Sequence, residues 1–219
     1  MKIVNFSKEN SILNQYVSEL RDINIQNDRL RFRRNIERIG ELMAYEISKT
    51  LDYSDKEVQT PLGVATASTH DDKVVIATVF RAGLPMHQGF LNIFDRAGNA
   101  FVSAFRYYKD EAQSEVDVNI EYIAAPSLTD KTLLLVDPML ATGESLDLAW
   151  KAFQTKGNPS KLHIACIIAS QQGVDHLAKA FPQDDVTLWC AAIDPKLNDH
   201  KYIVPGLGDA GDLAYGDKI

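Results

Sequence analysis

One segment of the sequence combines the residues that a phosphate-binding turn needs. Residues 137–145 read DPMLATGES and directly follow the apolar run at 132–136. A loop that enters a helix presents free backbone N–H groups, and the helix dipole adds positive potential there. The small residues at 141–143 let an anion approach the backbone, and Thr142 and Ser145 add hydroxyl donors. The segment therefore predicts an anion cradle that lacks a lysine.

Asp137 stands at the end of the predicted strand, where open α/β sheets bind their ligands. A carboxylate there can accept hydrogen bonds from ribose hydroxyls or from water around a metal ion. Ser145 is predicted to be a helix-start hydroxyl rather than a nucleophile, because Asp147 replaces the closing glycine of a nucleophile elbow. The sequence contains no GxxxxGK[ST] motif, which excludes a P-loop NTPase.

Two further motifs are rejected on their context. Residues 206–211 match GxGxxG, but only eight residues follow Gly211, which is too few for a βαβ dinucleotide site. The five histidines are scattered and favour surface or core positions over metal ligation. They are His70, His87, His163, His176 and His200. Cys166 and Cys190 lie in apolar runs, which predicts two buried thiols in a reducing compartment.

The segment 29–34, together with Arg38, is the one dense basic cluster. Interleaved acidic residues favour a charged helix face that pairs internally or at a subunit contact. Nucleic-acid binding and an anion-binding helix beside an active site remain as alternatives. The net charge of −7 argues against general binding of nucleic acid or anionic membranes.

Apolar periodicity predicts the elements that must position these residues. A helix at 29–49, capped by Asn27 or Asp28, precedes strand 73–80 and helix 84–94. The later predicted elements are strands 101–107, 116–123 and 132–136, helix 144–155, strand 162–170, helix 173–180 and strand 186–193. Continuous apolar strands spaced by helices indicate an α/β fold with a parallel sheet covered on both faces.

The whole length of 219 residues favours a single domain, residues 1–219. The N-terminus lacks the apolar segment of a signal peptide, and no apolar run reaches the roughly 18 residues of a membrane helix. We therefore expect a soluble, cytoplasmic protein without membrane or nucleic-acid partners. Residues 194–219 show neither helical nor strand periodicity, yet they carry Tyr202, Ile203, Leu207 and Leu213. A packed functional loop is the prediction for this segment.

Several blocks together resemble the type I phosphoribosyltransferases, and specifically the uracil phosphoribosyltransferase family. The segment 137–145 resembles the family's loop for phosphoribosyl pyrophosphate (PRPP). Residues 81–84, which read RAGL, resemble the segment after its first core strand. Residues 202–212, YIVPGLGDAGD, are similar to its C-terminal uracil-binding loop, with Asp194 upstream. Phe32 and Arg33 also fit, so the resemblance spans nearly the whole chain.

The resemblance implies a helical N-terminal region at about 1–58, an α/β core at about 59–193 and a uracil-binding segment or hood at 194–219. It implies Asp137, Asp209 and Arg106 as catalytic residues. Arg81 and Arg106 would hold the pyrophosphate. The ribose and 5′-phosphate would lie on Asp137, Pro138, Met139, Leu140, Ala141, Thr142, Gly143, Glu144 and Ser145. Uracil would lie on Ile203, Gly208, Asp209 and Ala210, with Asp209 also near the donor.

The implied reaction joins uracil to PRPP and yields uridine 5′-monophosphate (UMP) and pyrophosphate, as in pyrimidine salvage. Magnesium would enter with the donor, without a dedicated protein site. The resemblance also implies a homo-oligomer, dimer or tetramer, through the N-terminal helical region, and leaves GTP open as an effector. Displacement at the anomeric carbon requires positioning and electrostatic stabilisation rather than a protein nucleophile.

Three segments depart from the family pattern. Glu144 stands where the family usually has glycine, and its carboxylate would repel a 5′-phosphate unless it points into solvent. The ending 213–217, LAYGD, lacks the family's usual basic residue and terminal threonine. The stretch 107–118 is acidic where the family has a mobile hood. Two alternatives stay open: a type I phosphoribosyltransferase for another base, and a non-catalytic nucleotide-sensing or RNA-binding regulator on the same fold.

Overall fold

The computed structural model describes residues 1–70, 73–108, 116–181 and 185–218, and the side chains of residues 104–121 lie outside that description. The chain order is β1 (Lys2–Asn5), η1 (Phe6–Lys8), α1 (Ile12–Arg21), α2 (Arg29–Ser48), β2 (Tyr53–Thr60), β3 (Gly63–His70), β4 (Val74–Phe80), α3 (Leu84–Ile93), β5 (Gly98–Tyr108), β6 (Val116–Ala124), β7 (Thr132–Val136), β8 (Met139–Leu140), α4 (Glu144–Gln154), β9 (Lys161–Ser170), α5 (Gln171–Ala180), β10 (Val186–Asp194), β11 (Lys196–Leu197), β12 (Ile203–Val204) and α6 (Ala210–Tyr215).

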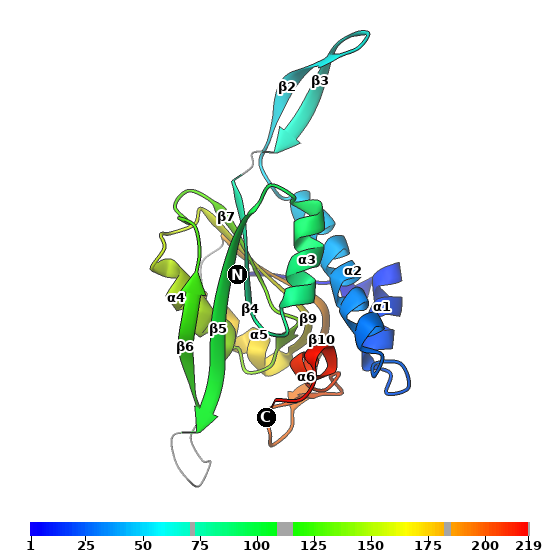
Figure 1. The fold of residues 1–219 in the computed structure, drawn as a ribbon, viewed down its shortest axis with the longest axis vertical. Helices are drawn as coiled ribbons and strands as arrows, with labels where there is room; N and C mark the ends of the chain where they lie inside the picture. Colours follow the sequence, from blue (N-terminus) through cyan, green and yellow to red (C-terminus); the bar gives the residue numbers. More distant parts are fainter. Residues whose placement is uncertain (71–72, 109–115, 182–184, 219) are drawn as a thin grey trace.

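A central sheet organises the molecule, with strand order β1-β10-β9-β7-β4-β5-β6 and β8 beside β9 (Figure 1). All pairs in it are parallel except β5 with β6. Helices α1, α2 and α3 lie on one face, and α4 and α5 lie on the other. The predicted α/β class with helices on both faces is therefore confirmed. The predicted parallel sheet is found in the core, and at its edge β6 pairs antiparallel with β5.

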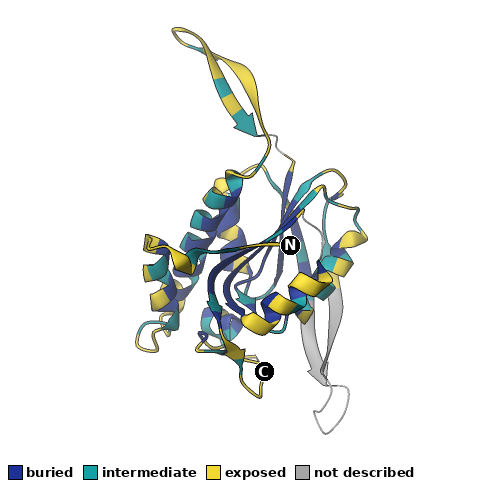
Figure 2. Ribbon diagram, turned by 180° about the vertical axis from the view of Figure 1, so that it is seen from behind, coloured by how far each residue is buried: buried dark blue, intermediate teal, exposed yellow. Residues whose placement is uncertain are grey.

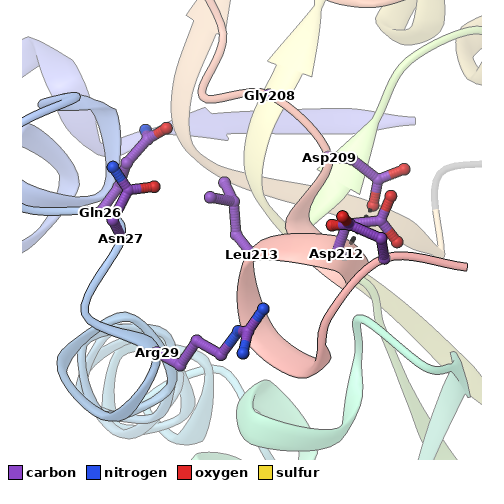
Figure 3. Close-up of a pocket in the computed structure, with 8 residues that line it drawn as sticks. Gln26, Asn27, Arg29, Gly208, Asp209, Asp212 and Leu213 are labelled. Atoms are coloured by element: carbon purple, nitrogen blue, oxygen red, sulfur yellow. Dashed lines mark hydrogen bonds between the residues drawn. The ribbon is translucent and has the colours of Figure 1, made fainter.

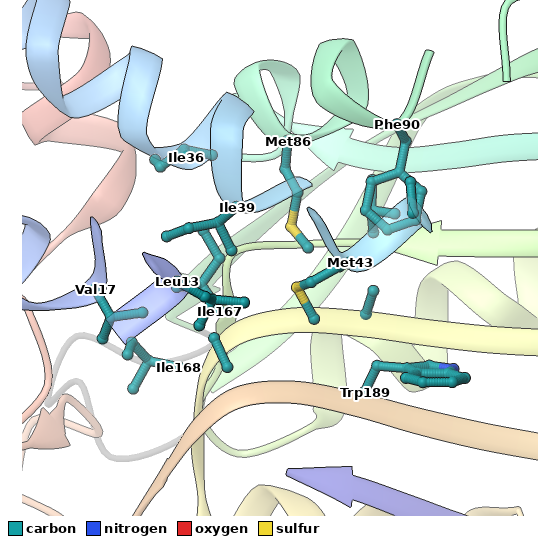
Figure 4. Close-up of a cluster of buried hydrophobic side chains, with 14 of the residues drawn as sticks. Leu13, Val17, Ile36, Ile39, Met43, Met86, Phe90, Ile167, Ile168 and Trp189 are labelled. Carbon is teal, nitrogen blue, oxygen red and sulfur yellow. The ribbon is translucent and has the colours of Figure 1, made fainter. Parts of the chain in front are cut away.

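Alternate residues of the buried strands feed two separate cores. Leu134 and Val136 of β7 face α1–α3, whereas Leu133 and Leu135 face α4 and α5. A strand exposes successive side chains to opposite faces, so a sheet covered twice needs apolar residues at every position. Figure 4 shows the α1–α3 side, where Met43 lies near Trp189 of β10. This packing explains why the continuous apolar runs predicted strands correctly.

Local signals also place the helices as expected. Helix α2 begins after Asp28, whose side chain accepts a hydrogen bond from the Arg31 N–H at 3.0 Å. The predicted helices at 84–94, 144–155 and 173–180 correspond to α3, α4 and α5 within three residues at each end.

The sequence analysis missed the β2–β3 hairpin, which projects from the body with most of its residues exposed (Figure 2). The expected boundary near residue 58 falls inside β2. Because both faces of this ribbon meet solvent, its sequence lacks the alternation that marks a half-buried strand. The turn at 60–63, TPLG, was the available signal, since proline and glycine favour a tight turn.

The C-terminal segment is packed, as predicted, but it is not free of regular structure. Ile203, Leu207, Ala210 and Ala214 are all buried in the α1–α3 core. The strands β11 and β12 pair antiparallel, and residues 210–215 form α6. Elements of two and six residues are too short to show a period, so only tertiary packing reveals them.

Candidate active site

The carboxyl ends of neighbouring parallel strands bring the predicted site residues to one edge of the sheet. Arg81 follows β4, and Asp137 follows β7, which is the strand next to β4. Asp194 ends β10, and β10 lies beside β9. This edge is where open α/β sheets bind their ligands.

The phosphate-loop segment, residues 137–145, is held by its immediate neighbours. The Asp137 carboxylate accepts a hydrogen bond from the Met139 N–H at 3.1 Å. The Pro138 carbonyl accepts from the N–H groups of Ile167 and Ile168 on β9. The Ser170 hydroxyl donates to the Ala141 carbonyl at 2.6 Å. Contacts to β9 thus fix the course of the loop before any ligand binds.

Helix α4 begins in the geometry that an anion site needs. Gly143 precedes it with φ at 89°, in the left-handed region, and offers no side chain as a cap. A Cβ at this position would lie 2.8 Å from the His176 ring, so glycine is required twice over. The first-turn N–H groups of a helix without a side-chain cap are suited to bind phosphate.

Glu144, which would repel a 5′-phosphate unless it points into solvent, is exposed. Its Oε2 accepts a hydrogen bond from the Thr142 hydroxyl at 3.2 Å, and its N–H donates to the same hydroxyl at 3.4 Å. The carboxylate therefore lies at the solvent side of the helix start, where the dipole favours negative charge.

The C-terminal predicted residues stand at the start of α6. Asp209 caps that helix by accepting from the Asp212 N–H at 3.0 Å, and Lys218 donates to its other oxygen at 3.2 Å. Burial alone raises the pKa of the Asp209 carboxyl, but hydrogen bonds from Asp212 and Lys218 outweigh burial and lower it. Asp209 is therefore ionised at neutral pH.

Arg81 joins the two halves of the site. Its guanidinium donates to the Asp212 carboxylate at 2.9 Å and to the Gly216 carbonyl at 3.3 Å. This contact carries an arginine from the end of β4 onto the C-terminal segment. Met139 and Ala141 also pack against the same buried cluster as Ile203 and Ala210. The predicted donor residues and base residues thus meet in one region.

A groove of about 370 Å³ opens beside this segment (Figure 3). It is lined by Gln26, Asn27, Arg29, Gly208, Asp209, Asp212, Leu213 and Asp217. Figure 3 shows Leu213 pointing toward the turn that joins α1 to α2. Two of the residues predicted to bind uracil, Gly208 and Asp209, therefore line a solvent-accessible space.

Comparison with known proteins identifies the family. The family model described as uracil phosphoribosyltransferase matches residues 7–217. The chain belongs to the uracil phosphoribosyltransferase family. A uracil phosphoribosyltransferase of Porphyromonas gingivalis is 60% identical over 219 residues, covering 100% of both chains.

Solved structures support the same fold. The AQ2163 protein from Aquifex aeolicus matches with a TM-score of 0.87 at 28% identity, covering 99% of each chain. An orotate phosphoribosyltransferase of Mycobacterium tuberculosis, solved with PRPP, matches with a TM-score of 0.51 at 13% identity, covering 87% of this chain and 94% of that one. The second likeness is one of fold alone.

In this uracil phosphoribosyltransferase fold, the structure describes only the backbone of Arg106, one of the predicted site residues. Its backbone lies in β5, paired with Val118 of β6, and its side chain lies outside the described residues. The acidic stretch 107–118, expected to act as a hood, lies largely outside them as well.

The remaining predictions fall into structural roles. Cys166 and Cys190 are free and buried, with their Sγ atoms 3.4 Å apart. In the arginine cluster, Arg31 and Arg34 pair within the N-terminal helices, with Glu19 and Glu37 respectively. Internal pairing, one of the predicted alternatives, is thus confirmed for these two residues.

No described helix is long and apolar enough to cross a membrane. Among the described residues, no group of three or more His, Cys, Asp and Glu side chains is arranged to hold a metal ion.

Arg21 and Gln26 contact the site but were not singled out from the sequence, and Arg33 was noted there only as fitting the family pattern. Arg21 and Gln26 reach the backbone of the C-terminal loop from the end of α1 and the turn after it. Arg33 donates to the Ala214 carbonyl at 2.7 Å. Nothing in the local spacing of these residues indicates such contacts, because their partners lie more than 180 positions away.

Proposed function

We propose that this edge of the sheet carries out the reaction of the family: uracil and PRPP give UMP and pyrophosphate. The observation that carries the proposal is the Arg81–Asp212 contact, which joins the end of β4 to the segment that begins at Asp209. A transferase for this reaction must hold an anionic donor and a flat base side by side. We assign the donor to the sheet edge and the base to the C-terminal segment.

We assign the donor's ribose and 5′-phosphate to residues 137–145, on the strength of the uncapped start of α4 and the adjacent Asp137 carboxylate. Arg81 and Arg106 are assigned to the pyrophosphate. Arginine suits this leaving group, because its planar fork donates to phosphate oxygens in pairs. Asp212 accepts a hydrogen bond from Arg81, so we expect the pyrophosphate to compete with that carboxylate for the guanidinium.

We assign uracil to Ile203, Gly208, Asp209 and Ala210. Backbone N–H and C=O groups of a glycine-rich loop can read the edge of a flat ring. Uracil presents a carbonyl where cytosine presents an amine, so a fixed backbone donor would accept the first and reject the second. Mismatched buried polar groups can discriminate by about 10⁴. Asp209, which the proposal assigns to uracil and also to the donor, carries a lowered pKa and is ionised at neutral pH.

The chemistry assigned to this chain is positioning and electrostatic stabilisation. The anomeric carbon passes through an oxocarbenium-like state as pyrophosphate departs, and the arginines stabilise the departing charge. Magnesium is proposed to enter with the donor. The carboxylate oxygens of Asp137 and Asp209 can accept hydrogen bonds from water bound to that Mg²⁺, which needs no dedicated protein site.

The test is product formation from PRPP and magnesium with uracil, cytosine, hypoxanthine or orotate, separated by chromatography. We expect UMP from uracil, and nucleotide from the other bases at rates lower by about 10⁴. Comparable turnover of another base would keep the phosphate-loop assignment and overturn the assignment of residues 203–210. Donor binding without turnover of any base would favour the regulator alternative, and RNA binding at low salt would support it further.

We also propose that the chain works as a homo-oligomer, a dimer or tetramer. The β2–β3 hairpin stands free of the body (Figures 1 and 2), with Leu62 and Val64 exposed to 100% and 63%. A lone two-stranded hairpin is marginally stable in water, so a second copy covering it would explain its exposed apolar residues. Sedimentation of the wild type as a monomer at micromolar concentration would contradict this proposal. We expect Val64→Asp to shift an oligomer toward monomer.

Two smaller proposals follow from the family and the thiols. The free cysteines support a cytoplasmic location, because a reducing compartment leaves such a close pair unlinked. Fractionation of cells tests it. GTP is proposed as an effector by family resemblance alone, and the rate of UMP formation with and without GTP tests it.

A further inference from the structure

The last residue of α1 and the last residue of β10 form an ion pair across 173 positions of sequence. Arg21 Nη1 and Nη2 donate to the two oxygens of Asp194 at 2.7 and 2.8 Å. The Asp194 side chain is only 7% exposed, and that of Arg21 is 23% exposed. Such a fork-to-carboxylate pair is both strong and directional.

Both members of the pair also bind the backbone of Gly206. Asp194 accepts a hydrogen bond from the Gly206 N–H at 2.8 Å, and Arg21 donates to the Gly206 carbonyl at 2.9 Å. One residue thus has its donor and its acceptor fixed by two charged side chains. Peptide groups are planar, so fixing both groups sets the planes on either side of Gly206.

The local backbone requires glycine at position 206. Gly206 has φ at 58°, and a Cβ there would collide with the Ile203 carbonyl oxygen. Gln26, in the turn after α1, donates to the Leu207 carbonyl at 3.2 Å. The chain is therefore held at two successive residues directly before Gly208.

We propose that Arg21 and Asp194 are positioning residues for base recognition, which set the direction of the backbone groups that distinguish uracil from cytosine. The inference rests on the proposed assignment of uracil to residues 203–210. Neither side chain needs to touch the base. Their effect passes through the Gly206 and Leu207 peptides to the N–H groups that follow.

A second ion pair of the same kind provides a matched control. Arg31 donates to both oxygens of Glu19 at 2.8 Å, and the Glu19 side chain is 8% exposed. Its other partners, Asn35 and Gln15, lie on the same two helices. Breaking this pair disturbs the packing of α1 on α2 without removing a bond to residues 206–207.

The experiment measures steady-state kinetics of Asp194→Asn, Arg21→Lys and Glu19→Gln, with uracil and with cytosine as acceptor. We expect Asp194→Asn to raise the KM for uracil about tenfold or more and to lower the uracil-to-cytosine ratio of kcat/KM, with the donor KM within about twofold. Arg21→Lys should act in the same direction, since lysine cannot donate as a fork. Glu19→Gln should lower Tm and leave both KM values unchanged.

Equal effects of Asp194→Asn and Glu19→Gln on the uracil KM would overturn the proposal. A loss confined to kcat or to the donor KM, with the base ratio unchanged, would overturn it as well. Should Asp194→Asn fail to fold, Arg21→Lys decides by the same criteria. A wild type that prefers another base would contradict the assigned base site and the inference with it. A normal wild type with unchanged variants would contradict the inference alone.

Discussion

The phosphate-loop segment and the C-terminal base segment are held in opposite ways. The side chain of Asp137 bonds two residues away, and the most distant partner described above, Ile168, is 30 positions from Pro138. The base segment depends on Arg21, Gln26 and Arg33, which lie 181 to 185 positions from their partners. A local unit can be recognised by its spacing. The conformation of a loop held by distant side chains depends on how the rest of the fold places those side chains.

The largest effect is expected from Asp137→Ala, which removes the carboxylate at the strand end beside the phosphate loop. We expect kcat to fall by about 10²–10³, as for loss of one preorganised polar group in an active site. Tm should change little, because the loop keeps its backbone bonds to β9. Calorimetry and the UMP assay check both. A variant that melts normally and keeps the wild-type rate would contradict the assignment of this loop.

Substituting one glycine in each loop should affect the KM of a different substrate. Gly143 and Gly206 both have positive φ, and a left-handed alanine costs about 1–2 kcal/mol per residue. We expect Gly143→Ala to raise the donor KM about tenfold. Gly206→Ala should raise the uracil KM by more than about tenfold, because its Cβ also collides with the Ile203 carbonyl oxygen. Initial-rate measurements with each substrate varied in turn distinguish the two. If either variant raised both KM values equally, the two loops would act as one unit.

The control for this pair is Gly63→Ala in the hairpin turn. A Cβ there meets nothing within 4 Å, so both KM values should match the wild type.

The next prediction concerns His163 in β9, the strand that holds the phosphate-loop segment. Burial, followed by repulsion from Lys161, lowers the pKa of His163 to about 4. The unfolded chain binds this proton near pH 6.5, so stability falls as pH drops from about 6.5 toward 4. His163→Gln removes the effect, and the stability difference from wild type should shrink by about 2–3 kcal/mol between pH 7 and pH 4.

Urea titrations at several pH values, followed by tryptophan fluorescence, measure this difference. Trp189 donates to His163 Nδ1 at 3.1 Å, so its fluorescence reports directly on the surroundings of His163. A constant difference across this pH range would contradict a buried neutral histidine. Neither KM should change at pH 7.

The smallest effect is expected from Glu144→Gln, which removes a negative charge at the start of α4. The side chain is exposed, and glutamine still accepts the Thr142 hydroxyl. Repulsion of a 5′-phosphate should ease, so the donor KM should fall about two- to threefold, as for a weakly coupled surface charge. The uracil KM should not change. A rise in the donor KM would show that Glu144 supports the loop instead.

The comparison also explains which parts of the fold could be predicted. Strands β4, β7, β9 and β10 are buried on both faces, so their apolar runs were unambiguous. Helix α6 and the β2–β3 hairpin gave no such signal. The six residues of α6 depend on the Asp209 cap and on the Arg33 bond to Ala214. The hairpin has no buried face, so it lacks alternation.

The amino-acid sequence by itself determined the α/β class, the order of the buried strands along the chain and the strand-loop-helix course of residues 132–154. Each of these rests on residues close together in the chain, so spacing records it. Only the tertiary structure decided that Arg81 meets Asp212 and that Arg21 and Asp194 fix Gly206. The Arg81–Asp212 and Arg21–Gly206 contacts join residues 131 and 185 positions apart in the sequence, and the Asp194–Gly206 bond joins residues 12 positions apart. Arginine and aspartate can pair with many partners, so packing alone selects the pairs.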